Sequence, residues 1–190
     1  MKLIGVAGTN GSGKDTIGEM LAERHNFLWV IVSDFLREEC RRRGLPIERE
    51  NLRMISAEWR REFGLGVLVD KSIEQFKNSS NKYDGVVSIP MRNTGEAQHL
   101  KELGGTLIWV DADPQIRYKR ITSRRRTAED DKTYQEFLEE EKAESKHSGD
   151  SATLNVAEVK PLCDIFLTND GDDKKTFMDA AEEALGLKSE

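Results

Sequence analysis

The sequence predicts a three-layer α/β fold, in which a five-stranded parallel sheet lies between two layers of helices. Short runs of β-branched and aromatic residues recur along the chain, and stretches with helical periodicity separate them. The five runs cover residues 3–7, 28–32, 85–89, 107–111 and 164–168. This alternation of strands and helices is typical of a parallel sheet that is covered on both faces.

The stretches between the strands carry apolar residues at helical spacing. The clearest stripes are Ile17, Met20 and Leu21, then Leu52, Ile55 and Trp59, and finally Phe177, Ala180, Ala181 and Leu185. Asn93 and Pro114 are suitable helix starts. The gap from 33 to 82 is long enough for two or three helices, which is more than one strand-to-strand crossover needs. We therefore predict a helical insert there.

A chain of 190 residues favours one domain, residues 1–190. Its predicted parts are a core of residues 1–32, 83–123 and 151–190, an insert at 33–82 and a lid at 124–150. The lid combines Arg124, Arg125 and Arg126 with an acidic helical stretch at 134–144. We expect this polar segment to be mobile, or to be a plain solvated helix.

Composition excludes several classes of protein. Hydrophobic residues make up 37% of the chain, and no apolar run approaches the length that spans a membrane. No charged and apolar leader precedes the first strand, so we expect a cytoplasmic protein. The net charge of -6 argues against sequence-independent binding of nucleic acid. Cys40 and Cys163 are predicted packing residues, and the three histidines lack the spacing of a metal site.

A glycine-rich segment lies between the first predicted strand and the first predicted helix. From Gly8 to Thr16 it reads Gly-Thr-Asn-Gly-Ser-Gly-Lys-Asp-Thr, which matches the phosphate-loop pattern Gly-x4-Gly-Lys. Glycines let backbone amides point at phosphate oxygens, and Lys14 can reach the β- and γ-phosphates. The residues expected to bind ATP are Gly8, Asn10, Gly11, Ser12, Gly13, Lys14, Asp15 and Thr16.

The position after the loop lysine departs from the usual pattern. Asp15 replaces the usual Ser or Thr, and Thr16 follows one place later. We expect Asp15 and Thr16 to hold Mg²⁺, directly or through water. The alternative is that Asp15 only interacts with the helix dipole in the first turn.

Several segments beyond the loop resemble nucleoside monophosphate kinases, adenylate kinase especially. The segment Ser-Asp-Phe-Leu-Arg ending at Arg37 resembles the family's Gly-Asp-x-Leu-Arg. The segment Ser-Ile-Pro-Met-Arg ending at Arg92 resembles Asp-Gly-x-Pro-Arg, and Arg120-Ile-Thr-Ser-Arg124 resembles Arg-Ile-x-x-Arg. The resemblance implies a P-loop kinase fold with an acceptor-binding insert and a short lid.

The resemblance also implies roles for residues. Arg37 and Arg92 are expected on the acceptor phosphate, Arg120 over adenine and Arg124 on the ATP phosphates. Asn169 and Gly171 are expected where the family's last loop passes adenine, and Asp34 is expected to orient or deprotonate the acceptor. Catalysis would then rest on Lys14, Arg92, Arg120, Arg124 and Asp34, by positioning and charge.

The sequence departs from that family at three places. The acidic residue that helps hold Mg²⁺ aligns with Ser88, so Asp15, Asp111 or Asp113 would compensate. The adenine-reading glutamine aligns with Glu96, so Glu96 is expected to read a different acceptor base. No arginine follows Arg126, which leaves Arg117 to Arg126, or Lys142 and Lys146, to meet transition-state charge.

Three functions stay open at this point. The first is transfer of the γ-phosphate of MgATP to a (deoxy)nucleoside monophosphate by a monomer or homodimer. The second is the reaction of dephospho-CoA kinases, which also resemble the chain in the phosphate loop, at Ile89-Pro90 and in the arginine-bearing helix. A small archaeal-type group of uncharacterised kinase-like proteins looks similar around 124–144. The third function is a nucleotide-binding switch or ATPase without a small-molecule acceptor.

Overall fold

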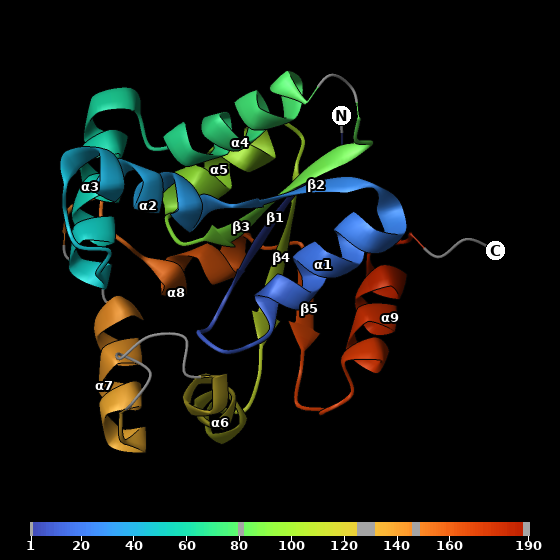
Figure 1. Ribbon diagram of the computed structural model, residues 1–190. Helices are drawn as coiled ribbons and strands as arrows, with labels where there is room; N and C mark the ends of the chain where they lie inside the picture. The colour runs from blue at the N-terminus through green and yellow to red at the C-terminus, as the bar shows by residue number, and fades with distance from the viewer. Residues whose placement is uncertain (1, 80–81, 125–131, 146–148, 188–190) are drawn as a thin grey trace.

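The computed structural model describes residues 2–79, 82–124, 132–145 and 149–187, which form one five-stranded sheet with helices on both faces (Figure 1). The strands lie in the order β2-β3-β1-β4-β5, and all neighbours are parallel. Their bounds are Lys2–Gly8 for β1, Phe27–Ile31 for β2, Gly85–Met91 for β3, Thr106–Asp111 for β4 and Ile165–Thr168 for β5. The predicted three-layer α/β fold is confirmed.

The central strands are apolar because both of their faces are buried. Along β1, Ile4 and Val6 face one core, and Leu3 and Ala7 face the other. The first core lies under two helices, α1 (Lys14–His25) and α9 (Lys174–Ala184). The second lies under α4 (Val67–Asn78), α5 (Thr94–Glu102) and the short α8 (Val156–Val159), which is followed by a 3₁₀ turn at Lys160–Leu162.

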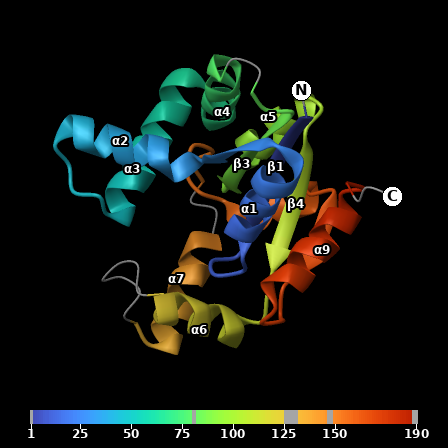
Figure 2. The ribbon, with the colours of Figure 1, turned by 45° about the vertical axis from the view of Figure 1, so that its right-hand side comes forward.

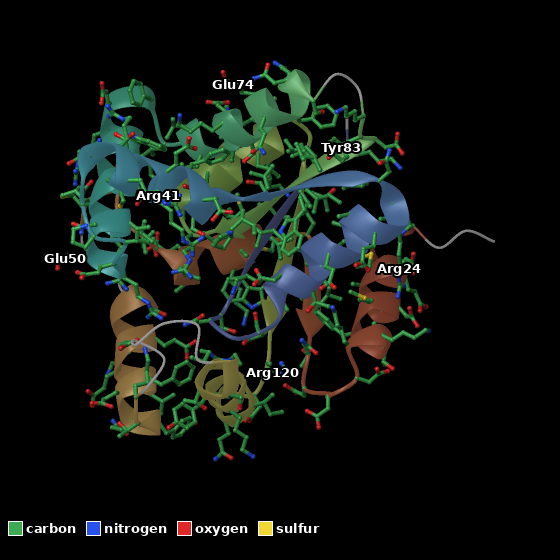
Figure 3. The ribbon with its side chains drawn as sticks, viewed as in Figure 1. Arg24, Arg41, Glu50, Glu74, Tyr83 and Arg120 are labelled. Atoms are coloured by element: carbon green, nitrogen blue, oxygen red, sulfur yellow. The ribbon has the colours of Figure 1, made fainter. Side chains whose placement is uncertain are left out.

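Arg24 joins the two helices of the first face. It lies near the end of α1, beside α9 (Figure 3). Its Nη1 donates to Asp179 at 2.7 Å and to Glu182 at 2.9 Å. These contacts hold α9 along α1, far from the phosphate loop.

The long gap between β2 and β3 holds three helices, as predicted. These are α2 (Val32–Arg43), α3 (Arg49–Phe63) and α4. The apolar stripe of α3 is buried at Ile55 and Trp59, which are 0% and 8% exposed. Helices α2 and α3 project together to one side of the sheet (Figure 2). These two helices of the insert therefore form a wall beyond one edge of the sheet, whereas α4 covers part of one face.

The lid segment contains α7 (Tyr134–Ser145), close to the predicted helical stretch, and follows α6 (Pro114–Arg124). Tyr118 of α6 packs edge-on against Tyr134 of α7, with ring centroids 5.3 Å apart, and Phe137 is 2% exposed beside them. Aromatic packing thus joins α7 to α6. Three candidates of the sequence, Arg125, Arg126 and Lys146, lie outside the described residues, as does the side chain of Arg124.

The carboxyl ends of the parallel strands meet at one edge of the sheet. The residues that follow the five strands there are Thr9, Val32, Arg92, Ala112 and Asn169. In open α/β sheets, ligands bind at this edge. Within the described part of the chain, no helix has both the length and the apolar character needed to cross a membrane.

Candidate active site at the phosphate loop

The glycine-rich segment forms a tight loop between β1 and α1, as its sequence predicted. Gly8 and Gly13 have φ angles of 141° and 97°, which favour glycine. A Cβ at Gly8 would lie 2.0 Å from the carbonyl oxygen of Val110, and one at Gly13 would lie 2.3 Å from Nδ2 of Asn169. The loop therefore requires glycine at both positions, and it leads directly into the amino end of α1, where anions bind.

Lys14 is the first residue of α1 and is 9% exposed. Its Nζ donates to the carbonyl oxygens of Gly8 at 3.1 Å and Thr9 at 2.5 Å. The ammonium group thus lies against the loop that the phosphates would enter. An incoming phosphate oxygen would exchange with these carbonyls as an acceptor.

The expected adenine-side residues come together behind the loop. Nδ2 of Asn169 donates to the carbonyl oxygen of Ser12 at 2.9 Å. Arg120 donates to the carbonyl oxygens of Asn169 at 2.8 Å and Gly171 at 2.6 Å, and it lies on α6 at the loop edge of the sheet (Figure 3). Three segments that are distant in sequence, 8–16, 120 and 169–171, are therefore one cluster.

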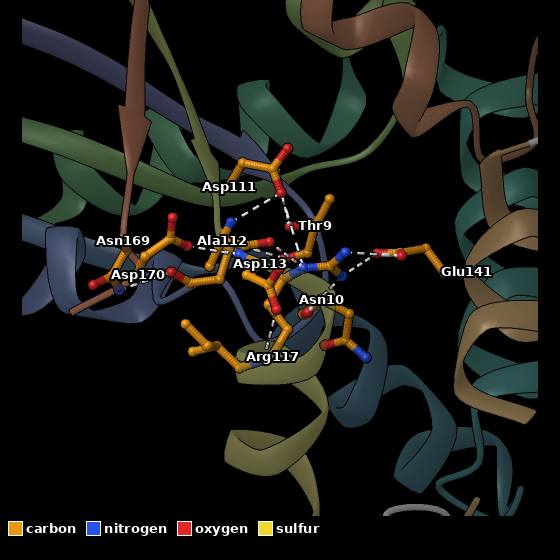
Figure 4. A network of polar contacts seen from close by, with 12 residues as sticks. Thr9, Asn10, Asp111, Ala112, Asp113, Arg117, Glu141, Asn169 and Asp170 are labelled. Carbon is orange, nitrogen blue, oxygen red and sulfur yellow. Dashed lines mark hydrogen bonds and ion pairs between the residues drawn. The ribbon is translucent and has the colours of Figure 1, made fainter. Parts of the chain in front are cut away.

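Arg117 is a central residue of the site whose contacts the sequence could not assign. It is 3% exposed, and its Nε donates to the carbonyl oxygen of Ala112 at 2.8 Å. Its Nη1 donates to the carbonyl oxygen of Asn10 at 3.3 Å, and its guanidinium forms a two-point ion pair with Glu141 of α7 (Figure 4). Arg117 thereby joins the phosphate loop, the end of β4 and the lid helix.

Asp111 and Asp113, two candidates to compensate for the missing acid, have local partners (Figure 4). Oδ1 of Asp111 accepts from the hydroxyl of Thr9 at 2.8 Å and from the amide of Ala112 at 2.9 Å. Oδ1 of Asp113 accepts from the amide of Gln115 at 2.8 Å in the first turn of α6. We therefore assign Asp111 to the loop and Asp113 to the start of α6.

Ser88, which aligns with the missing acid, contacts a helix that covers the sheet. It is fully buried, and its hydroxyl lies 2.8 Å from the hydroxyl of Ser72 on α4. No group of three or more His, Cys, Asp or Glu side chains that could hold a metal occurs among the described residues. Asp15 and Thr16 supply a carboxylate and a hydroxyl in the first turn of α1. Such hard oxygen ligands suit Mg²⁺, which keeps waters and substrate phosphates as its other ligands.

A cavity of about 200 Å³ lies between the insert and the end of β3. It is lined from α2, α3 and the β3–α5 connection, and Asn10 of the phosphate loop also borders it. Its charged lining residues are Arg37, Arg49, Arg53, Arg60, Arg92 and Glu96. The structure thus brings the predicted residues Arg37, Arg92 and Glu96 together and adds three arginines of α3.

The buried pair Arg60–Glu96 shapes the inner end of this cavity. Nε and Nη2 of Arg60 donate to Oε1 of Glu96 at 3.0 and 2.7 Å, and both side chains are at most 2% exposed. Oε2 of Glu96 accepts from the amide of Arg92 at 3.2 Å. Although Glu96 lines the cavity, its carboxylate is therefore engaged, and we assign it to positioning Arg60 rather than to reading a base.

Asp34 lies outside the residues that line the cavity. Its carboxylate is 60% exposed and accepts from Nη1 of Arg37 at 2.5 Å, while the same Nη1 lies 3.0 Å from the hydroxyl of Ser33. Its contact pairs Asp34 with Arg37, a lining residue of the cavity, and a role of Asp34 toward the acceptor stays a prediction.

A second cavity, of about 460 Å³, adjoins the first on the lid side of the loop. Asn10 and Arg92 border both cavities. Its walls come from the end of β4, from α7 and from α8, and they include Trp109, Lys142 and Lys160. The ammonium group of Lys160 lies 5.4 Å from the centre of a Trp109 ring, so one wall combines an aromatic face with a positive charge.

Comparison with known proteins places the chain in a family. A family profile described as an AAA domain matches residues 4–147. A UPF0200 protein of Saccharolobus islandicus is 31% identical over 173 residues, which cover 90% of this chain and 85% of that protein. The chain belongs to the AAA domain family and to the UPF0200 proteins. A UPF0200 protein of Methanococcus maripaludis is 27% identical and covers 90% of this chain and 89% of its own length.

Solved structures share the fold at low sequence identity. A shikimate kinase from Bacteroides thetaiotaomicron matches with a TM-score of 0.57 and 14% identity, over 98% of this chain and 99% of that chain. A gluconokinase from Sinorhizobium meliloti matches with a TM-score of 0.51 and 15% identity, over 98% and 90%. The fold is therefore the P-loop kinase fold that the resemblance implied.

Proposed function

We propose that this protein is an ATP-dependent phosphotransferase that transfers the γ-phosphate to a small nucleotide-like acceptor, a (deoxy)nucleoside monophosphate. The observation that carries the proposal is the arginine-lined cavity, which meets the phosphate loop at Asn10. A loop that binds the donor and a cationic cavity that binds an anionic acceptor share that border. Such an arrangement suits in-line transfer between two bound phosphates.

On the donor side, the amides of residues 8–14 and Lys14 would bind the ATP phosphates. Arg120, Asn169 and Gly171 form a cluster beside the loop, where they would border the adenine. Mg²⁺, with Asp15 and Thr16 as protein oxygen ligands, would neutralise charge on the transferring phosphates.

On the acceptor side, Arg92 would bind the acceptor phosphate, because it borders both cavities beside the loop. Arg37 would assist it from α2, with Asp34 and Ser33 holding its guanidinium. Guanidinium groups bind phosphate through two parallel hydrogen bonds, which fixes orientation as well as charge. The acceptor phosphate is already ionised at neutral pH, so transfer to it needs no strong general base.

The test is ADP release from MgATP with each common ribo- and deoxyribonucleoside monophosphate, with dephospho-CoA and with no acceptor. We expect ADP formation that depends on one class of monophosphate and falls at least about 100-fold in Arg92→Gln. Arg41→Gln is the matched control, because Arg41 is an exposed arginine of α2 outside the cavity lining. Slow release that ignores every acceptor would contradict the proposal and favour a nucleotide switch.

The second cavity favours one further candidate, dephospho-CoA kinase. It extends the acceptor space past Arg92 along an apolar wall that includes Leu138, Val156 and Ala157. An acceptor with a long tail would use this space, and a mononucleotide would not fill it. ADP release that requires dephospho-CoA, and not its nucleotide part alone, would identify this alternative.

A further inference from the structure

The arginines that line the acceptor cavity extend over a longer distance than one phosphate spans. Five arginines and one glutamate are its charged lining residues. Three of these arginines have acidic partners in the structure: Arg37 contacts Asp34, Arg49 contacts Glu140 and Arg60 contacts Glu96. This inference rests on the proposed function, because it concerns the acceptor of the same site.

Three of the five arginines lie on one face of α3. Arg49, Arg53, Ser56 and Arg60 all line the cavity and follow one another at intervals of four, three and four residues. Such spacing puts side chains on one helix face. At about 1.5 Å per residue, the eleven steps from Arg49 to Arg60 extend roughly 16 Å, so one phosphate cannot contact both ends.

Contacts define the two ends. The inner end lies at Arg60. This residue contacts Glu96, and Glu96 accepts from the amide of Arg92, which also borders the second cavity beside the phosphate loop. Nη1 of Arg49 lies 3.1 Å from Oε2 of Glu140 on the lid helix α7, which marks the outer end.

We infer that the acceptor carries a second anionic group, a phosphate or a carboxylate, which Arg53 and Arg49 bind at the outer end of the cavity. The first anion lies at Arg92, beside the phosphate loop. The second lies about two to three helical turns from Arg60 along α3, within reach of Arg53 and Arg49, which are an i, i+4 pair. Acceptor selectivity then depends on α3, a helix that has no role in holding ATP.

The contact between Arg49 and Glu140 does not prevent this role. Their side chains are 31% and 46% exposed, and exposed pairs of this kind contribute little to stability. Glu140 also forms an ion pair with Lys132, so its carboxylate keeps a partner when Arg49 turns to an anion. An arriving anion therefore exchanges with a weak contact.

The experiment is titration calorimetry with two matched pairs of ligands, which separate the two sources of charge. Uridine and orotidine 5′-monophosphates differ by a carboxylate, and adenosine 5′-monophosphate and adenosine 3′,5′-bisphosphate differ by a phosphate. We expect the ligand with two anions to bind at least about tenfold more tightly in one pair. That preference should fall to within about twofold in Arg53→Gln, and the affinity for the monophosphate should fall much less than the affinity for the ligand with two anions.

Two further variants complete the design. Arg53→Lys keeps the charge but loses the planar fork, so it should keep part of the preference. Arg61→Gln is the control, because Arg61 lies on α3, contacts Asp150 and does not line the cavity. Each variant is checked by its thermal unfolding midpoint, and Arg49→Gln replaces any variant of Arg53 that fails to fold.

Equal affinities within both pairs, or an equal loss for all ligands in Arg53→Gln, would overturn the two-anion site. Neither result would contradict transfer to a monophosphate, which ADP release tests separately. Conversely, a preserved binding preference without any acceptor-dependent ADP release would contradict the proposed transfer and leave the two-anion site standing.

Discussion

Two arginine–glutamate pairs lie on opposite sides of the phosphate loop, and they differ in how firmly they are held. Arg60–Glu96 joins α3 to α5, and its side chains are 2% and 1% exposed. Arg117–Glu141 joins α6 to α7, and its glutamate is 23% exposed. A buried pair cannot open without leaving a charge in an apolar surrounding, whereas Glu141 can be hydrated as it leaves. We therefore expect α3 and α5 to stay fixed, and α7 to separate from α6 more readily.

Glu96→Ala should give the largest loss of stability, because it removes one partner of the buried pair. It leaves the guanidinium of Arg60 buried without a counter-charge, so we expect the free energy of unfolding to fall by about 3–5 kcal/mol. Urea unfolding of the variant and the wild type measures this value. A loss below about 1 kcal/mol would mean that the wall adapts and is not fixed.

Glu141→Ala tests the other pair and should cost less. Arg117 keeps the carbonyl oxygens of Ala112 and Asn10 as acceptors, and water can replace Glu141. We expect a loss of about 1–2 kcal/mol. Amide hydrogen exchange should become faster in α7 and stay unchanged in α3. Faster exchange in both helices would contradict the contrast between wall and lid.

Arg49→Gln removes the exposed contact between the insert and the lid. We expect the unfolding free energy to change by less than about 1 kcal/mol, because exposed pairs are weak and screened. Urea unfolding at low and high salt checks this value. A larger, salt-sensitive loss would show that the insert and the lid are coupled before any ligand binds.

The smallest expected effect concerns Cys163, which reports on the core beside α8. Burial raises the pKa of the Cys163 thiol to about 11, so the group stays protonated and unreactive near neutral pH. Reaction with a thiol reagent should be slow in the wild type and in Glu141→Ala, and faster in Glu96→Ala. Equal acceleration in both variants would show that the accessibility of the Cys163 thiol depends on the contact of α7 as much as on the buried pair.

The strand pattern and the phosphate loop could be predicted because both depend on local sequence. All five predicted strands form, and the loop from Gly8 to Lys14 lies between β1 and α1. The acceptor cavity could be predicted only in part. Arg37 and Arg92 follow strands within recognisable segments, whereas Arg49, Arg53 and Arg60 lie in an ordinary charged amphipathic helix. Their spacing placed them on one face, but it did not say what that face would meet.

By itself, the sequence determined the order of the strands along the chain, the helix-rich insert and the glycine loop, because periodicity and glycine conformation act over a few residues. Only the tertiary structure decided the partners of the charged side chains. It turned Glu96 toward Arg60, Asp34 toward Arg37 and Ser88 toward Ser72. Ion pairs and buried hydrogen bonds depend on which surfaces packing brings together, and such contacts join residues that are distant in the chain.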